Sequence, residues 1–305
     1  MRDIFIKTLL SEATRNHEIV LITGDLGFGV LDKFSSKLPN QFINTGVNEQ
    51  SMMSIAAGIA STGKRVFVYS IGNFPTLRCL EQIRNDVCLM KNPVAVVSVG
   101  AGYAYGPQGY THHALEDIAA MRSLPNMHVL SPCDDFETRE LTSILCKGYT
   151  PAYLRLGTSG KGNIHSENIK LELGKIIEIH SGPDGTILFS GSVGHEAKLA
   201  REILRERGLE VAIASMPFIS DVDKGYLESA SKKGPLVVVA EHSYRGGLGS
   251  SVLETLAELR IQAKVGLVAS SQVNLSQIGS QDYLRKVNGI SAKTISSKFT
   301  SLMEF

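Results

Sequence analysis

The feature that most constrains the fold of this chain is the alternation of short β-branched runs with longer segments of helical period. The runs "EIVLITGDLG" (18–27), "RVFVYSIG", "PVAVVSVGAG" and "MHVLSP" end in turn residues and are too short for helices, so they predict strands. Between them, segments such as "NEQSMMSIAAGIASTG" and "TLRCLEQIRNDVCLMK" carry apolar residues at helical spacing. This alternation predicts an α/β fold with mainly parallel sheets flanked by helices.

The alternation occurs twice, which predicts two domains. The chain has 305 residues, and a domain typically has about 150 residues. After Gly157 the segment "GTSGKGNIHSENIKLELGK" is polar and without a strong period, and a second series of strands and helices begins at "GTILFSGSVG". We therefore expect a first domain over residues 1–165, a linker over 166–184 and a second domain over 185–305.

The composition is that of a soluble globular protein, with 43% hydrophobic and 20% charged residues. A net charge of +1 gives no reason to expect nucleic acid or an anionic membrane as partner. The four cysteines form no C-x-x-C pair and predict free thiols in a reducing compartment. The start, "MRDIFIKTLLSEATRN", resembles an amphipathic helix and not a signal peptide, so we expect a cytoplasmic protein.

Ligands of open α/β sheets bind beyond the carboxyl ends of the strands. This rule selects five loops, at Asp25, at Glu49, and over residues 69–74, 100–113 and 241–249. Four of them belong to the first domain, where we expect the chemistry. The last, "GGLGSS", lacks the third glycine of a dinucleotide fingerprint and gives only weak support for a nucleotide-binding module.

Glu49 lies in "GVNEQ", where an extended run meets the helix that it opens. An acid in the first turn is stabilised by the helix dipole by about 0.3–1 kcal/mol, which is sufficient reason for its presence there. The neighbouring residues are small and apolar, however, and burial favours the protonated carboxyl. A glutamate under both influences is suited to share a proton with a ligand nitrogen.

Two further loops carry candidate side chains. Tyr69 and Phe74 lie at a strand end and in the following loop, where either ring fills the core or stacks on a flat ligand. Arg78 and Arg84 fit a solvated or ion-paired helix face better than a ligand site. In "GAGYAYGPQGYTHHALED" the dense glycines permit close approach of a ligand. His112 and His113 end this loop, and with no third metal ligand nearby, acid–base work or substrate hydrogen bonding suits them better than a metal site.

The segments "TGVNEQSMMSIAAGIASTGKRVFVYS", "NFPTLRCLEQIRNDV", "GYTHHALEDIAAMRSLPNMHVLSPCD" and "VVVAEHSYRGGLGSSV" together resemble the C-terminal half of a transketolase. The resemblance covers nearly the whole chain, in order. It implies a thiamine-pyrimidine-binding domain followed by the transketolase C-terminal domain. The implied activity is transfer of a two-carbon ketol unit from a ketose to an aldose with thiamine diphosphate as cofactor.

The resemblance also implies roles for individual residues. Glu49 matches the catalytic acid that hydrogen-bonds N1′ of the cofactor's aminopyrimidine and promotes its imino form. His112 matches a catalytic histidine that contacts substrate. The other implied contacts are to the cofactor, for Phe74, Tyr69, Asp25 and Ile71, and to the substrate, for His113, Gln108 and Arg155, the last at a position that often binds a sugar-phosphate oxygen.

One part of the family's active site is missing from this chain. The diphosphate and Mg²⁺ are usually held by a GDG motif followed by an Asn pair, and the nearest string here is "GDLG". Because the family also occurs as split pairs of chains, we expect a partner subunit with the diphosphate-binding domain, and a heterotetramer with two chains of each kind.

The substrate loop also departs from the family pattern. Gln108 stands where an aspartate is expected, His113 replaces a glutamine, and Gly29 replaces a phosphate-binding serine. Sites built for such polar contacts discriminate strongly, so we expect an acceptor other than the ordinary aldose phosphate, either unphosphorylated, modified or nucleotide-linked. The alternatives are a β-subunit of a 2-oxo-acid dehydrogenase, a 1-deoxyxylulose 5-phosphate synthase-like enzyme, and a non-catalytic scaffold subunit.

Overall fold

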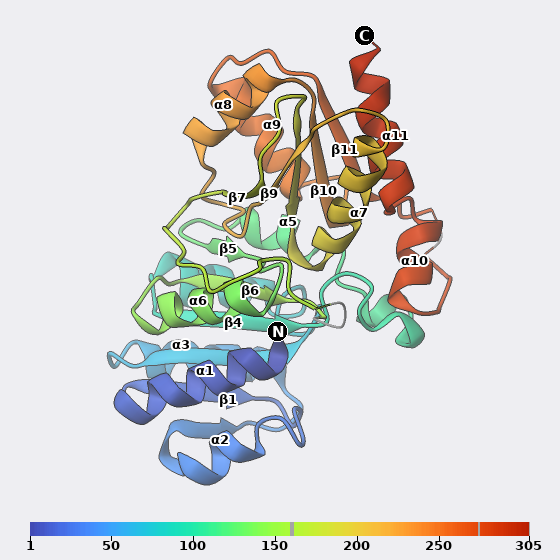
Figure 1. Ribbon diagram of the computed structural model, residues 1–305. Helices are drawn as coiled ribbons and strands as arrows, with labels where there is room; N and C mark the ends of the chain where they lie inside the picture. Colours follow the sequence, from blue (N-terminus) through green and yellow to red (C-terminus); the bar gives the residue numbers. More distant parts are fainter. Residues whose placement is uncertain (159–161, 274, 305) are drawn as a thin grey trace.

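The first domain is built on a six-stranded parallel sheet, which lies in the lower half of Figure 1. The computed structural model describes residues 1–158, 162–273 and 275–304. The strand order is β2-β1-β3-β4-β6-β5, and each neighbouring pair runs parallel. The bounds are β1 Ile19–Thr23, β2 Phe42–Asn44, β3 Arg65–Ile71, β4 Val94–Val99, β5 His128–Leu130 and β6 Ala152–Leu156. The parallel sheet expected from the sequence is confirmed.

Helices cover both faces of this sheet, and its central strands are therefore apolar on both sides. One face packs against α1 (Arg2–Arg15), α2 (Asp32–Lys37) and α6 (Asp135–Cys146). The other packs against α3 (Glu49–Ala60), the π-helix η2 (Ile83–Leu89) and α5 (Asp117–Arg122). The segment expected as one helix near residue 80 is thus a short α4 (Leu80–Gln82) that continues as η2. Short 3₁₀ turns lie in the loops, at η1 (Pro39–Gln41), η3 (Gly106–Gln108) and η4 (Tyr110–His112).

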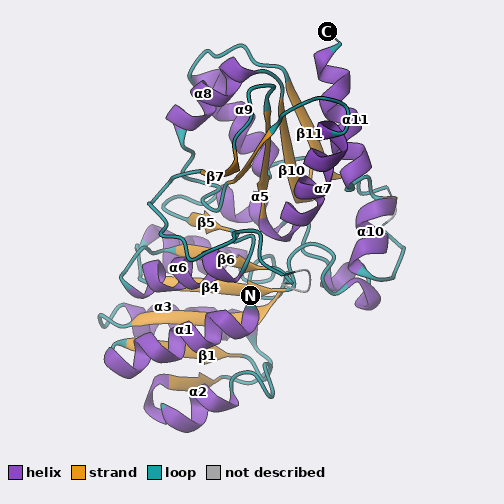
Figure 2. Cartoon of the chain, in the orientation of Figure 1, coloured by secondary structure: helices purple, strands orange, loops and turns teal. Residues whose placement is uncertain are grey.

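The second domain has a five-stranded sheet in the order β11-β10-β8-β9-β7, in which only the edge strand β7 is antiparallel to its neighbour. The strands are β7 Ile177–His180, β8 Thr186–Ser190, β9 Ala212–Ser215, β10 Leu236–Ser243 and β11 Val265–Ser270. Helices α7 (Gly194–Arg205) and α11 (Ala292–Met303) pack on one face, and α8 (Lys224–Lys233) and α9 (Leu248–Glu258) on the other (Figure 2). The turn η5 (Gly191–Val193) precedes α7, and α10 (Gln281–Val287) precedes α11.

The second sheet begins earlier than the sequence indicated. Strand β7 lies within the predicted linker over 166–184 and pairs with β9. Its residues alternate between exposed and half-buried, because an edge strand contacts the core with one face only. The short sequence "KIIEIH" interrupts its isoleucines with charged and polar residues and therefore lacks the continuous apolar run that marks the buried strands.

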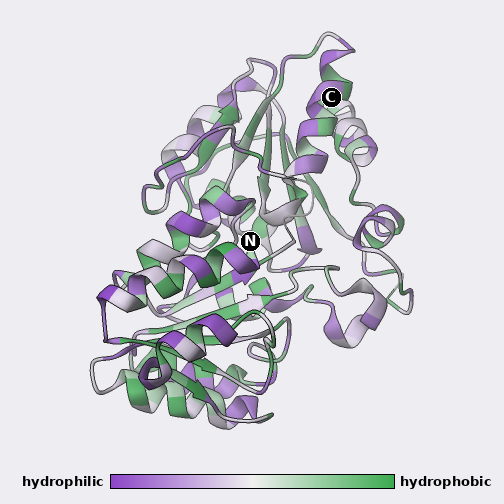
Figure 3. Ribbon diagram, turned by 60° about the horizontal axis from the view of Figure 1, so that its bottom comes forward, coloured by the Kyte–Doolittle hydropathy of each residue, from purple (hydrophilic) through white to green (hydrophobic). Residues whose placement is uncertain are grey.

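The two domains share one apolar core. Residues of β3 and β4 belong to the same buried cluster as residues of β8, β10 and α9, and the strands of both sheets are largely hydrophobic in Figure 3. At the junction, the free edge of β5 is paired by the segment that follows β9, where Ser131 N–H donates to Pro217 and Ile219 N–H donates to Val129. Among the residues described, none of the helices is long and apolar enough to cross a membrane. All four cysteines are buried and free.

Candidate active site

Glu49 is the first residue of α3, and Asn48 caps this helix by accepting a hydrogen bond from Ser51 N–H. The carboxylate is buried, with 5% of the residue exposed. It directly follows the loop after β2, at the carboxyl end of the sheet, where open α/β sheets bind ligands. A buried carboxylate is stable only with a partner, because burial removes its hydration.

The partner of Glu49 is Arg78. Its Nη1 donates to Glu49 Oε2 at 2.6 Å, and the Arg78 side chain is 48% exposed. The same guanidinium lies over the ring of Phe74, 4.8 Å from its centroid. Arg78 is ion-paired and half-exposed, as one of the two expectations stated, but it lies in the turn before α4 and not on a helix face, and its partner belongs to the candidate site. The signal that could have identified this pair was the burial of Glu49, which requires a cation or a donor nearby.

Phe74 and His112 meet from two different loops. Their ring centroids are 5.3 Å apart, and the rings meet edge to face at 70°. The two loops are also joined by a hydrogen bond from Asn73 Nδ2 to the carbonyl of His113. Gly72 suits this turn because its φ of 44° lies in the left-handed region, which glycine adopts without strain. The structure thus brings together Glu49, Phe74 and His112, together with Arg78.

His113 is placed differently from its neighbour. It is 1% exposed, and its ring meets those of Tyr103 and Tyr110 edge to face. Burial lowers the pKa of its imidazole, which favours the neutral form. Neither ring nitrogen has a hydrogen-bond partner among the described residues. The side chain faces protein, so this geometry does not support the substrate contact expected from the sequence.

Two other predicted residues lie in the interior. Tyr69 is 1% exposed and stacks on Phe5 of α1, with ring centroids 6.2 Å apart. Burial raises the pKa of its phenol. Tyr69 follows Phe67 by two residues on β3, so both side chains point to the same face of the sheet. The ring of Phe67 also packs near Phe5, and Tyr69 therefore fills the core on this face. The sequence left open whether Tyr69 fills the core or stacks on a ligand, and the geometry supports core filling.

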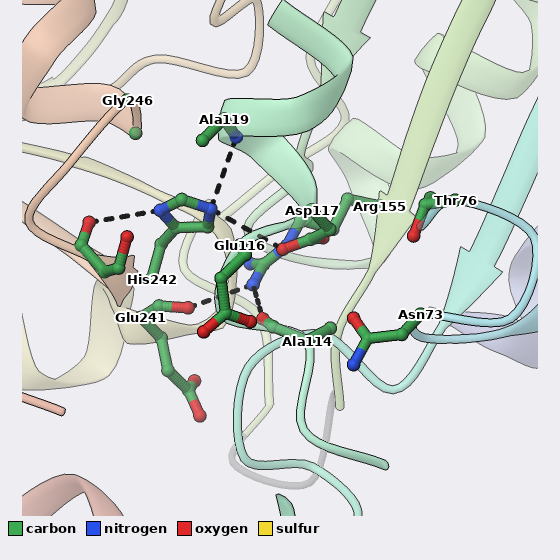
Figure 4. A network of polar contacts seen from close by, with 12 residues as sticks. Asn73, Thr76, Ala114, Glu116, Asp117, Ala119, Arg155, Glu241, His242 and Gly246 are labelled. Atoms are coloured by element: carbon green, nitrogen blue, oxygen red, sulfur yellow. Dashed lines mark hydrogen bonds and ion pairs between the residues drawn. The ribbon is translucent and has the colours of Figure 1, made fainter. Parts of the chain in front are cut away.

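Arg155 is also buried, and Figure 4 shows its contacts. Its Nε donates to Asp117 Oδ2 at 2.6 Å, and its Nη2 donates to the carbonyls of Ala114 and Glu241. Through these Nε and Nη2 bonds the guanidinium joins the first domain to β10 of the second, and the residue is only 3% exposed. The sequence offered no signal for Asp117, because an acid in a first helical turn is common.

The remaining predicted residues lie at strand ends and in loops. Asp25 is exposed after β1 in a left-handed conformation (φ 56°), and its N–H donates to Asn44 Oδ1 at the end of β2. Ile71 is half-buried as the last residue of β3, and Gln108 is exposed in η3. These positions are compatible with ligand contacts, which stay predictions.

One buried group among the described residues has the composition of a metal site, although the sequence suggested none. Cys133, Glu137 and His165 place their donor atoms within 4.8 Å of one another. Two of the three donor groups already bond within the protein, because Glu137 accepts from the Cys133 backbone N–H at 2.7 Å and contacts His165 Nε2 at 3.0 Å. The group joins the start of α6 to the segment between the domains.

Comparison with known proteins agrees with this architecture. Residues 1–160 match the family description "Transketolase, pyrimidine binding domain", and residues 174–295 match "Transketolase, C-terminal domain". The chain is 36% identical over 267 residues to one of the subunits of the apulose-4-phosphate transketolase of Phocaeicola vulgatus, covering 87% of this chain and 86% of that relative. It is 34% identical to the 1-deoxy-D-xylulose-5-phosphate synthase of Thermomicrobium roseum, over 97% of this chain and 48% of that protein.

A solved structure is similar over nearly the whole of this chain. It is described as a split gene transketolase in an inactive beta4 tetramer, and it superimposes with a TM-score of 0.90 at 30% identity, covering 99% of this chain and 97% of that one. The chain therefore belongs to the transketolase family and corresponds to the subunit of split transketolases that carries the pyrimidine-binding and C-terminal domains.

Proposed function

We propose that this chain is the pyrimidine-domain subunit of a split, thiamine-diphosphate-dependent transketolase that transfers a two-carbon ketol unit from a ketose to an aldose. One observation carries the proposal: a buried carboxylate, Glu49, lies close to a half-buried aromatic ring, Phe74, at the carboxyl edge of a parallel sheet. A flat heterocycle with a ring nitrogen needs both a face to pack on and a carboxyl to bond. These residues therefore fit the aminopyrimidine end of the cofactor.

The residues of this chain have distinct roles in the proposed site. Glu49 binds N1′ of the aminopyrimidine and exchanges a proton with it, and Phe74 packs on the ring. His112 contacts Phe74 and faces the substrate as an acid–base group. Asp25 and Ile71 flank the cofactor from the ends of β1 and β3. When bound, thiamine diphosphate supplies the stabilised carbanion that the transfer requires.

A second subunit completes the site. The only string in this chain similar to a diphosphate motif is "GDLG", so the diphosphate and Mg²⁺ are held by a partner with the diphosphate-binding domain. The split transketolase of known structure is described as inactive when its beta chains form a tetramer, which supports the need for a partner. We propose a heterotetramer with two chains of each kind. The cytoplasmic location expected from the sequence stays a prediction.

The acceptor is proposed to lack the usual phosphate contact. Arg155, at the position expected to bind a sugar phosphate, is buried, and its Nε and Nη2 donate to Asp117 and to two backbone carbonyls. The exposed Gln108 carries no charge. A neutral, modified or nucleotide-linked sugar is therefore favoured over ribose 5-phosphate. A kinetic comparison tests this: a clear preference for ribose 5-phosphate over all such acceptors contradicts it.

The test of the main proposal uses the complex that copurifies with the tagged chain from its native host. The complex should contain a second polypeptide and bind thiamine diphosphate. The isolated chain, supplied with the cofactor and Mg²⁺, should show no robust ketol transfer. Glu49→Gln should lower turnover of the complex by at least about a hundredfold, because the proton shared with N1′ is lost. Unchanged turnover would indicate a scaffold subunit.

The similarity to 1-deoxyxylulose 5-phosphate synthases supports one other candidate function. Such an enzyme consumes pyruvate, whereas a transketolase consumes a ketose. Supplying the complex with each donor separately, with one aldehyde acceptor, distinguishes the two functions. The same assay with a lipoyl acceptor tests the 2-oxo-acid dehydrogenase alternative.

A further inference from the structure

Arg78 occupies both surfaces that the proposed function assigns to the cofactor ring. Its guanidinium bonds the Glu49 carboxylate and at the same time lies over the ring of Phe74. A guanidinium is flat and carries several N–H donors in one plane. It therefore matches an aminopyrimidine in its flat shape, although a guanidinium only donates hydrogen bonds. One carboxylate oxygen and one ring face cannot serve both groups at once.

We propose that Arg78 is a placeholder that fills the aminopyrimidine site of the free chain and moves out when the cofactor binds. This inference rests on the proposed function. In the free chain the ion pair supplies the partner that the buried Glu49 needs, so the pocket is stable before the cofactor arrives. Binding replaces one partner of Glu49 with another, and the carboxylate is at no stage left alone in the interior.

The two ends of the ion pair differ in freedom of movement. The Glu49 side chain is 6% exposed and lies in the first turn of a capped helix, whereas the Arg78 side chain is 48% exposed. A half-exposed arginine regains hydration when it turns toward solvent, and only its contacts with Glu49 and Phe74 are lost. Movement of Arg78 is therefore the easier route to an open site.

The proposal predicts that removal of Arg78 makes the cofactor bind more tightly. When only a fraction of the protein is competent to bind, the apparent dissociation constant equals the intrinsic one divided by that fraction. Arg78→Met retains much of the side-chain length and removes the charge and the donors. In the copurified complex, stripped of cofactor, titration calorimetry with thiamine diphosphate at fixed Mg²⁺ and salt should show about threefold to tenfold tighter binding for Arg78→Met.

Matched controls separate this effect from a general loss of charge. Arg84 is exposed on the same segment, and its Nη1 bonds only the neighbouring Asn85 among the contacts described. Arg84→Met should bind the cofactor as the wild-type complex does. Arg78→Lys keeps the charge but not the flat group, so its affinity should lie between those of wild type and Arg78→Met.

The free full-length chain provides a readout without cofactor. Arg78→Met should lower the midpoint of denaturant unfolding more in the wild-type chain than in Glu49→Gln, because the ion pair exists only when both groups are present. Equal shifts in the two backgrounds would show that the pair does not form and would overturn the proposal.

If Arg78→Met bound the cofactor equally or more weakly, Arg78 would be a supporting group of the site and not a placeholder. If the wild-type complex bound no cofactor, the proposed function would fail as well.

Discussion

At the scale of single residues, burial determines the charge state of His242. His242 is fully buried, its Nδ1 contacts the Ser243 carbonyl at 3.1 Å, and its Nε2 accepts from Ala119 N–H at 3.4 Å (Figure 4). This arrangement fits a neutral imidazole with its proton on Nδ1. Burial lowers the pKa of His242 from its ordinary value of 6.5 to about 4.

The lowered pKa predicts a loss of stability in acid. Because the unfolded imidazole takes up its proton at higher pH than the folded one, the free energy of unfolding falls as the pH drops from about 6.5 to 4. This residue contributes at most about 3 kcal/mol to that fall. The difference between wild type and His242→Asn, measured by denaturant unfolding at several pH values, should shrink over this range. His17→Asn, at an exposed position, is the control, and parallel curves for wild type and His242→Asn would contradict the prediction.

At the scale of elements, Asp134 joins a helix to the connection between the domains. Its Oδ1 accepts from the N–H groups of Phe136 and Glu137 and so caps α6. Its Oδ2 accepts from the N–H groups of Ile164 and His165. One buried carboxylate therefore satisfies four backbone donors from two segments that are distant in sequence.

Loss of this cap should destabilise the chain more than loss of an ordinary one. Asp134→Ala leaves buried donors unpaired as well as removing the cap, so we expect a loss of about 3 kcal/mol in the free energy of unfolding. Ser291 caps α11 by accepting from one backbone donor, Thr294 N–H, and its hydroxyl also bonds Thr294 Oγ1. Ser291→Ala should lower the free energy of unfolding by about 1 kcal/mol. Denaturant unfolding of both variants measures the difference, and equal losses would show that Asp134 acts only as a helix cap.

At the scale of the whole molecule, Glu241 links the domains. This buried carboxylate lies near the end of the long strand β10 and accepts from Tyr103 N–H in the glycine-rich loop at 2.7 Å and from Arg285 Nε at 2.9 Å. Arg285 also donates to Ser192. The loop that carries His112 in the first domain is therefore held by a charge from the second.

Removing one charge of this pair should destabilise the fold strongly. Arg285→Met leaves Glu241 buried without its cation, and breaking a buried ion pair in this way costs about 3–5 kcal/mol. Glu241→Gln combined with Arg285→Met should recover part of the loss, because no charge is then unpaired. Lys286→Met, on the exposed side of the same helix, is the control. If the double variant were no more stable than Arg285→Met, the loss would come from packing and not from charge.

Local patterns in the sequence were sufficient for the architecture and for the place of Glu49. The periods of strands and helices depend on neighbours a few residues apart, and so does the position of an acid at the start of a helix. The edge strand β7 was missed because only one of its faces meets the core.

The partners of the charged groups required the folded chain. Arg78 meets Glu49 across 29 residues, and Arg155 meets Asp117 across 38. Which of Tyr69 and Phe74 faces the site depends on the packing of α1 against β3, which buries Tyr69 under Phe5. Such contacts follow from the order of the strands and the docking of two domains, and no short stretch of sequence carries that information.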